Sequence, residues 1–253
     1  MAFATLERKD GIAVVTLNRP DRLNAMSLAL NTDVATVLEE AGRDPAVKAI
    51  VFTGAGRAFC AGDDLKEFDQ QTASPDAIRA HIEAIQRVTR ALMFSDKIVI
   101  GAIHGYAVGG GFEWLLNCDM VVAAADLVAF FPEMDWGQFV TGGVTHLLPQ
   151  ALGHQRAMEL MVLGERKSAA DLQALGIVNW VVSGSAMLAK AMAVAEQVAG
   201  KSQFSTSRLK RVLTRELSGQ LARAIEIEAA ITMEAFARSE AAERVTRFTK
   251  RKG

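Results

Sequence analysis

The order of apolar and polar residues predicts a chain that alternates strands with helices. Residues 3–17 alternate on both sides of Asp10 and Gly11, which is typical of a β-hairpin with an Asp-Gly turn. Residues 27–41 place apolar side chains at helical spacing, and Ser27 can cap the start of that helix. The apolar run over residues 48–53 predicts a short buried strand.

The middle of the chain continues this order of helices and strands. Ser74 as a cap and Pro75 at the first helical position predict a helix whose apolar stripe runs to Leu92. Three consecutive glycines, Gly109 to Gly111, then precede a short apolar segment. The predicted elements of this part are strands over residues 97–103, 120–124 and 127–131 and a helix over residues 112–118.

Beyond Gly137 the pattern becomes predominantly helical. Helices are predicted over residues 142–152, 155–163 and 169–174, and from Ser185, Gln203 and Gly219 onward. No linker rich in Pro, Gly or Ser separates the helices from Ser185 onward from the rest of the chain, so only a soft boundary near Gly184 is predicted. We therefore expect a core domain over residues 1–184 and a helical region over residues 185–253 that packs on the core or on a neighbouring subunit.

Length and composition place the chain among ordinary globular proteins. Its 253 residues allow one large core, and 50% of them are hydrophobic while 23% are charged. The first residues lack a secretory signal, and no uncharged apolar run reaches the ~18 residues that cross a bilayer. We therefore expect a cytoplasmic location and no membrane partner. Cys60 and Cys118 form no Cys-x-x-Cys pair, so we predict two buried or half-buried thiols and no metal site.

The net charge of −1 hides an asymmetry along the chain. Residues 201–253 carry 12 Lys and Arg against 6 Glu, whereas the preceding residues are acidic overall. Such a basic region can attract an anionic ligand or a complementary subunit, or it can be a solvated helical surface. Charge alone leaves these interpretations open.

Several familiar motifs of nucleotide-binding and hydrolytic proteins are incomplete or absent. Gly54 and Gly56 lack the third glycine of a dinucleotide loop, and residues 200–202 lack the upstream glycine of a phosphate loop. No Gly-x-Ser-x-Gly elbow occurs. The four histidines are scattered, and we expect His81 to face water on its helix. Structural roles are expected for the other three: His104, His146 and His154.

One glycine-rich turn carries a chemical signal. Gly109 to Gly111 allow a substrate to approach the backbone, and the helix that follows leaves its first N–H groups unpaired. Glu113 lies one turn along that apolar helix, where an unpaired buried charge is costly. The pattern therefore predicts an anion-binding corner with a functional carboxylate beside it.

A second candidate carboxylate, Glu133, follows Pro132 directly after a predicted strand. Pro132 ends the strand and fixes the backbone, so that Glu133 can point into a cleft. A glutamate at an ordinary loop corner is the alternative, and Asp135 competes for the same role. The local pattern does not choose between these interpretations.

Four ordered segments resemble the signatures of the crotonase, or enoyl-CoA hydratase/isomerase, superfamily. They are Leu17-Asn-Arg-Pro-Asp-Arg-Leu-Asn-Ala25, Thr53-Gly-Ala-Gly-Arg-Ala-Phe-Cys-Ala-Gly-Asp-Asp-Leu-Lys66, Gly105-Tyr-Ala-Val-Gly-Gly-Gly-Phe-Glu113 and Phe131-Pro-Glu133. Residues 164–178 resemble the family as well. The resemblance implies an α/β fold, a spiral of strand-strand-helix units followed by a C-terminal helical region that forms a homotrimer or a homohexamer.

The same resemblance implies a role for each of four residues. The backbone N–H groups of Asp63 and Gly110 would form an oxyanion hole for a thioester oxygen. Glu113 would chiefly activate water at C3, and Glu133 would chiefly deliver the proton to C2, with both sharing the water. Because relatives that hydrate 2-enoyl-CoA esters have glutamate at both positions, an enoyl-CoA hydratase is predicted. An acyl-CoA thioester is then the substrate, coenzyme A is part of it, and no bound cofactor is expected.

Contacts to the CoA moiety are implied at the matching positions Arg22, Leu23, Asp64, Leu65 and Lys66. Lys250, Arg251 and Lys252 could reach its phosphates from the same or an adjacent subunit. Two features depart from the usual family pattern. Asp63 is larger than the small residue of many relatives, so its side chain is expected to point away from the enolate. The loop over residues 137–145 lacks a proline, and the bulky side chains of Trp114, Trp136 and Phe139 leave acyl specificity open.

Two other functions stay open at this point. A double-bond isomerase needs the same oxyanion hole but only one obligatory base. A non-catalytic binding or scaffold protein could keep the fold and use its basic region on a polyanion such as RNA, although no nucleic acid partner is expected. The presence of both glutamates favours catalysis.

Overall fold

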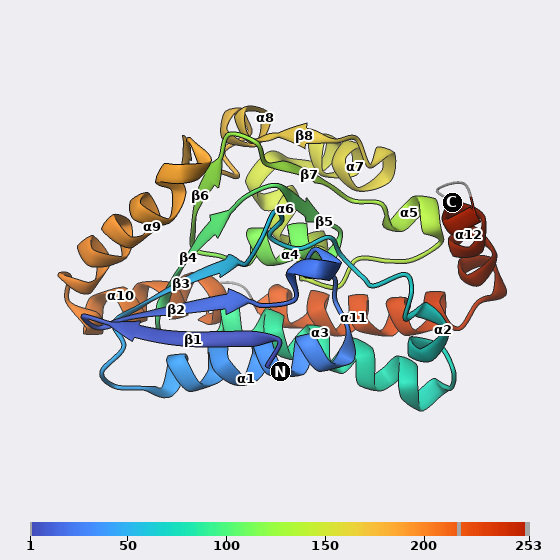
Figure 1. The fold of residues 1–253 in the computed structure, drawn as a ribbon, viewed down its shortest axis with the longest axis horizontal. Coiled ribbons are helices and arrows are strands. Elements are labelled where there is room, and N and C mark those ends of the chain that lie inside the picture. Colours follow the sequence, from blue (N-terminus) through green and yellow to red (C-terminus); the bar gives the residue numbers. More distant parts are fainter. Residues whose placement is uncertain (1, 217–218, 251–253) are drawn as a thin grey trace.

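The computed structural model describes residues 2–216 and 219–250 (Figure 1). The strands are β1 (Ala4–Lys9), β2 (Ile12–Leu17), β3 (Ala49–Gly54), β4 (Ile98–Ile103), β5 (Tyr106–Val108), β6 (Met120–Ala124), β7 (Val128–Phe130), β8 (Lys167–Ser168) and β9 (Trp180–Val182). The helices up to Leu163 are η1 (Pro20–Arg22), α1 (Leu28–Arg43), α2 (Phe68–Gln71), α3 (Pro75–Met93), α4 (Gly110–Leu116), α5 (Glu133–Trp136), α6 (Val144–Leu152) and α7 (His154–Leu163). The later helices are α8 (Ala169–Ala174), α9 (Gly184–Ala199), α10 (Gln203–Arg211), η2 (Val212–Glu216), α11 (Gly219–Phe236) and α12 (Ser239–Lys250).

The described strands form two sheets. The larger has the order β1-β2-β3-β4-β6-β9, in which β1 and β2 are antiparallel and every later neighbouring pair is parallel. The smaller has the order β5-β7-β8. The predicted hairpin is confirmed, because Asp10 and Gly11 have φ angles of 51° and 79°, the left-handed values that a tight two-residue turn requires.

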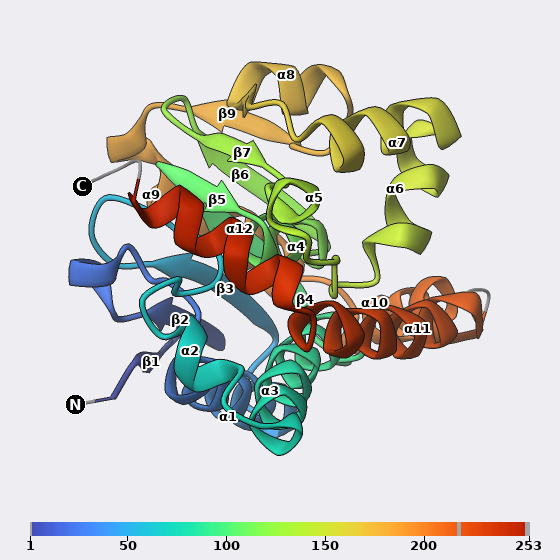
Figure 2. The ribbon, with the colours of Figure 1, turned by 90° about the vertical axis from the view of Figure 1, so that its right-hand side faces the viewer.

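Helices cover both faces of the larger sheet (Figure 2). On one face, Met187, Ala191 and Val194 of α9 pack against the buried side chains of β2, β3, β4 and β6. On the other face, α1, α3 and α4 share a continuous apolar core with the sheet. Every residue of β3 is buried, as expected for a central parallel strand covered on both sides.

The region after Gly137 is predominantly helical, as predicted, but it also contains two short strands that were not predicted. β8 pairs with β7, and β9 extends the larger sheet beyond β6. Both strands have only two or three residues, so neither is long enough to set up a period-two pattern of its own. Their pairing depends on strands that lie about 40 to 60 residues earlier in the chain, as in the register of Val122 with Trp180.

The C-terminal helices contact the core at several places, since α11 packs against α3 and α6, and α10 and α12 make further contacts. The Lys210 ammonium at the end of α10 is buried, lies 2.6 Å from Asp119 and donates to the carbonyl oxygens of Leu92 and Lys97. The last helix, α12, lies against α5, where the rings of Phe248 and Trp136 are 5.4 Å apart. The end of α10 thus meets the segments that precede β4 and β6, whereas α12 lies beside α5, which follows β7 (Figure 1).

Three smaller expectations can be compared with the described residues. Cys60 is buried and Cys118 is half-buried, and both are free thiols, as predicted. In the described part of the chain, no helix is both long and apolar enough to cross a membrane. Among those same residues, no cluster of His, Cys, Asp or Glu has the composition of a metal site.

Candidate active site

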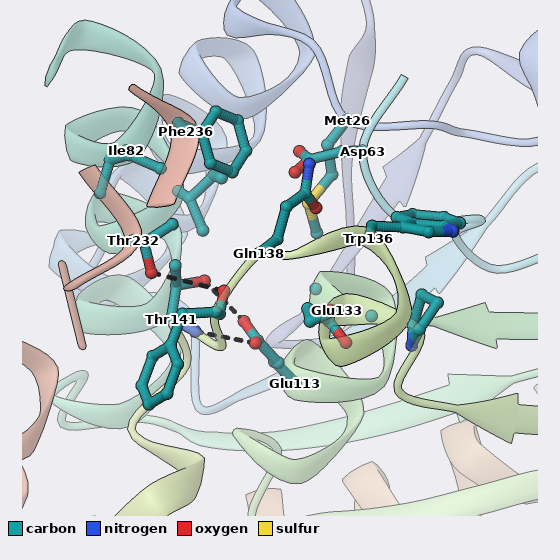
Figure 3. Close-up of a pocket in the computed structure, with 16 residues that line it drawn as sticks. Met26, Asp63, Ile82, Glu113, Glu133, Trp136, Gln138, Thr141, Thr232 and Phe236 are labelled. Carbon is teal, nitrogen blue, oxygen red and sulfur yellow. Dashed lines mark hydrogen bonds between the residues drawn. The ribbon is translucent and has the colours of Figure 1, made fainter. Parts of the chain in front are cut away.

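The four residues predicted to be catalytic lie around one small cavity (Figure 3). Asp63, Gly110, Glu113 and Glu133 line it together with side chains from α3, from α11 and from the loop after α5. Its volume is about 20 Å³, which is close to the minimum that one water molecule needs. Three carboxyl-bearing residues, Asp63, Glu113 and Glu133, therefore lie around a space of this size.

The start of α4 supplies the first backbone donor. Gly109 has a φ angle of +53°, and a Cβ atom added there would meet Oε1 of Glu133, so only glycine fits at this position. Gly110 is the first residue of α4, and its N–H therefore has no partner within the helix. The glycine-rich turn brings a free donor and the helix N-terminus to the cavity wall.

Asp63 supplies the second donor from the loop after β3. Its neighbours Gly62 and Asp64 bond to the backbone of Met26, whereas the Asp63 N–H donates to no described residue. The Asp63 carboxylate lines the cavity, and its Oδ1 lies 3.0 Å from Nε2 of His81. The oxygen is thus drawn toward α3, which agrees in part with the expectation that this side chain points away from the enolate.

The prediction that His81 faces water is wrong. His81 is only 1% exposed, and its ring lies 6.1 Å from that of Phe236 on α11. The face of α3 that carries His81 packs against α11 and against the loop that holds Asp63. These partners are distant in sequence, so the helical pattern of α3 alone could not reveal the burial.

Glu113 is buried and held by one residue. It is 1% exposed, its Oε1 accepts from the backbone N–H of Thr141 at 2.8 Å, and its Oε2 accepts from the Thr141 hydroxyl at 2.7 Å. Burial raises the pKa of Glu113 to about 8, the two Thr141 donors oppose this rise, and Glu228 and Asp63 add to it. Both donors favour the ionised form of this carboxyl.

Glu133 has a contrasting environment. It is the first residue of α5, it is buried, and its Oε2 has no hydrogen-bond partner in the described part of the chain. Burial raises the pKa of Glu133 well above its usual range, and the negative charges of Glu113 and Asp63 raise it further. Among the described residues, only the Glu133 backbone N–H opposes this rise and no side chain donates to the carboxyl. Glu133 is therefore the carboxyl better suited to hold a proton, and Glu113 is the better base.

A third buried glutamate fixes the loop that carries Thr141. The Glu228 carboxylate on α11 accepts from the N–H of Gly143, from the N–H of Thr145 at 2.9 Å and from the Thr145 hydroxyl. The Thr232 hydroxyl of the same helix donates to the carbonyl oxygen of Val140 at 3.2 Å. Helix α11 therefore positions the loop whose donors orient Glu113.

Replacing Thr141 with Val is expected to shift the acidic limb of the pH–rate profile to higher pH. The base must be ionised, so activity should rise as pH approaches the Glu113 pKa of about 8. The Thr141 hydroxyl lowers the Glu113 pKa because it donates to the ionised carboxylate. Valine lacks this donor, so the Glu113 pKa should rise and the acidic limb should move to higher pH. Thr141→Ser keeps the hydroxyl and is the matched control. An unchanged limb in Thr141→Val, measured as kcat/KM against pH, would exclude this role.

A much larger cleft opens beside the small cavity. It has a volume of about 890 Å³, and Asp63, Pro132 and Trp136 line both spaces. Four arginines from three parts of the chain also line it, namely Arg57, Arg166, and Arg244 with Arg247 on α12. Its size is that of a ligand site, and its charge suits an anionic ligand.

The residues expected to contact CoA lie in different places. Leu23 and Leu65 line the large cleft. Arg22 and Lys66 are exposed and outside its lining, and Asp64 is buried in an ion pair 2.8 Å from Arg19. Asp135, the competing carboxylate, lines the large cleft but not the small cavity. Lys250 is exposed at the end of α12, while residues 251 and 252 lie outside the described residues.

Comparison with known proteins gives a consistent result. The sequence model of the family described as "Enoyl-CoA hydratase/isomerase" matches residues 7–253. A probable mitochondrial enoyl-CoA hydratase of Dictyostelium discoideum is 33% identical over 225 residues, which are 89% of this chain and 80% of that protein. A probable enoyl-CoA hydratase of Mycobacterium bovis is 30% identical over 254 residues, covering 100% of this chain and 97% of that protein. The crystal structure of an enoyl-CoA hydratase from Mycobacterium avium subsp. paratuberculosis has a TM-score of 0.88 at 28% identity, covering 97% of this chain and 98% of that one.

Proposed function

The chain belongs to the enoyl-CoA hydratase/isomerase family, and from that premise we propose that it adds water across the 2,3 double bond of an enoyl-CoA thioester. The observation that carries this proposal is the pair of buried glutamates around a cavity of about 20 Å³. An isomerase needs only one base. Two carboxyls with contrasting surroundings at a water-sized space favour hydration.

The proposed reaction uses each residue in a distinct way. The N–H groups of Asp63 and Gly110 donate to the thioester oxygen, on which negative charge develops as water adds. Glu113 takes a proton from water while the water oxygen bonds to C3. Glu133 delivers its proton to C2, so that the product is the 3-hydroxyacyl thioester. CoA is part of the substrate, and no further cofactor takes part in this scheme.

We place the CoA moiety in the large cleft, with its phosphates near the four arginines. Replacing both Arg166 and Arg247 with Ala is expected to raise KM by about tenfold at low salt, because charged hydrogen bonds to phosphate are lost, and by less at high salt. The value of kcat should change little, since neither residue lines the small cavity. Lys9→Ala, on an exposed strand end, is the control. A KM equal to that of the unmodified protein at low salt would rule out this location.

Exposed apolar side chains support the expected assembly. Phe204 and Leu209 on α10 are 70% and 61% exposed, and Ile227 and Ile231 on α11 are exposed as well. Apolar groups concentrated on adjacent helices are typical of a surface buried between subunits. We propose that these helices form the interface of a homotrimer or homohexamer, as the family resemblance implies.

Sedimentation velocity at micromolar concentration is the test of this assembly. We expect a trimer or a hexamer, and we expect Phe204→Glu with Leu209→Glu to shift the protein to smaller species, because two charges cannot be buried unpaired. Lys201→Glu, beside the same helix but polar to begin with, should leave the assembly intact. A monomer for the unmodified chain would contradict the proposal.

We also propose that this protein is cytoplasmic, in contrast to the relative from Dictyostelium discoideum, which is described as mitochondrial. We further propose that it is a catalyst and not a scaffold for a polyanion. A protein that binds CoA esters but converts none of them would favour the scaffold.

A further inference from the structure

We infer that the acyl group accepted by this site carries a hydroxyl group near the double bond, held between Gln138 and Asp63; this inference rests on the hydratase function proposed above. The two side chains come from different segments, the loop after α5 and the loop after β3. Both line the small cavity (Figure 3). Neither is required by the hydration chemistry itself, which uses only the backbone N–H of Asp63.

Gln138 offers an unused donor at the cavity. The residue is only 6% exposed, and its Nε2 has no hydrogen-bond partner within the described residues. Leaving a buried amide donor unpaired costs free energy, which a ligand oxygen can restore. The donor therefore indicates that an acceptor atom belongs in this part of the site.

Asp63 offers an acceptor at the same cavity. The ring Nε2 of the buried His81 is hydrogen-bonded to Oδ1 of the Asp63 carboxylate, whereas Oδ2 makes no hydrogen bond with the described residues. The His81 contact holds this side chain in place at the cavity wall. Asp63 also lines the large cleft, so the hydroxyl can lie where the two spaces meet and leave the small cavity to the reacting water. One donor and one acceptor there match a group that both accepts and donates, and a hydroxyl does so with a single heavy atom.

The rest of the wall limits where such a group can lie. Ile82, Ile85, Phe139 and Phe236 give one part of the wall apolar side chains. An unsubstituted acyl chain against that part would leave the buried Gln138 donor unpaired. The Asp63 N–H is a proposed donor to the thioester oxygen, and the Asp63 carboxylate begins only one carbon away from the Cα that carries that N–H. The hydroxyl is therefore expected within a few carbons of the thioester, at C4 or C5.

The test compares matched pairs of substrates by kcat/KM. The pairs are 4-hydroxybut-2-enoyl-CoA with crotonyl-CoA, and 5-hydroxypent-2-enoyl-CoA with pent-2-enoyl-CoA. We expect at least one hydroxylated substrate to be preferred by about tenfold or more, since sites built to bond a hydroxyl reject analogues that lack it. Gln138→Leu should reduce that preference by about tenfold. Ile85→Leu changes the shape of the same wall without a polar group and should retain the preference.

Each outcome separates this inference from the proposed function. Hydration of both members of each pair at equal kcat/KM, or a preference for the unsubstituted esters, would overturn the hydroxyl subsite and leave the hydratase function standing. A preference that survives Gln138→Leu would exclude Gln138 as its source and so refute the subsite as stated. Absence of hydration with all four esters would overturn the proposed function, and the inference with it.

Discussion

Replacing Glu113 with Gln is expected to lower the rate of hydration by about 10³ or more, and Glu133→Gln is expected to have a similar effect. Each change removes one proton transfer and keeps the shape of the side chain. The two backbone donors and the large cleft stay unchanged, so the dissociation constant for a CoA ester should change little. The measurements are kcat for hydration and the affinity for a non-reactive acyl-CoA.

The stability of Glu113→Gln provides the folding control for this result. A buried carboxyl whose folded pKa of about 8 exceeds its unfolded value near 4.5 favours the folded state most at low pH, and that contribution is lost as pH rises toward 8. The introduced glutamine amide can still accept from the Thr141 N–H and donate to its hydroxyl oxygen. The variant should therefore unfold at a higher temperature than the unmodified protein at pH 8.

Nearly normal hydration by either Glu113→Gln or Glu133→Gln would show that the two-carboxyl assignment is wrong.

The second large effect is expected from Gly110→Pro compared with Gly110→Ala. Proline removes the N–H proposed for the oxyanion hole, and the first position of a helix is the one where proline is tolerated. Both variants add a Cβ atom that meets the flexible end of the Met26 side chain. Proline also places its ring Cδ where the amide hydrogen was, so the difference between the variants reports the lost donor together with any contact of Cδ with the thioester oxygen. A loss of at least about 10² in kcat is expected for Pro relative to Ala.

A matched pair of this kind has a clear negative outcome. If Gly110→Pro and Gly110→Ala both keep a kcat close to that of the unmodified protein, and circular dichroism and thermal unfolding indicate that both are folded, this N–H does not stabilise the enolate. If both are equally inactive, the contact with Met26 is the cause, and Met26→Ala in the same background should restore only the Ala variant.

The sequence predicted those parts of the fold and site that depend on local pattern. The hairpin at Asp10 and Gly11, the α3 helix and the glycine turn before Glu113 follow from residues that are neighbours in the chain. Such features depend on turn geometry, capping and periodicity. The family motifs then placed Asp63 and Glu133 near that turn, and the structure brings them to the same cavity.

The parts that could not be predicted depend on contacts between distant segments. Glu226 and Glu228 both lie in the same helical pattern, yet only Glu228 is buried and bonded to the loop at Gly143. The burial of His81 was missed for the same reason, because its partner Asp63 lies 18 residues away in the sequence. Thr141 gave no signal of its own, and its hydroxyl became informative only when the structure placed it 2.7 Å from Glu113.

The arginines of the large cleft illustrate the same limit. Arg57, Arg166 and the α12 pair Arg244 and Arg247 lie far apart in the sequence and converge only in the folded chain. The charge asymmetry of residues 201–253 pointed to the basic end of the chain. It did not identify Arg244 and Arg247 on α12 as cleft residues, nor Arg57 and Arg166 as their partners.

Incubation with enoyl-CoA esters in ¹⁸O-labelled water tests the hydratase function most directly. Mass spectrometry of the products from crotonyl-CoA, 4-hydroxybut-2-enoyl-CoA and a 3-enoyl-CoA separates hydration from isomerisation. We predict that at least one 2-enoyl ester gains one water molecule and carries ¹⁸O at C3, and that Glu113→Gln and Glu133→Gln abolish this uptake. Conversion of the 3-enoyl ester to a 2-enoyl ester, with no ¹⁸O from water incorporated into any of the esters, would contradict the hydratase assignment.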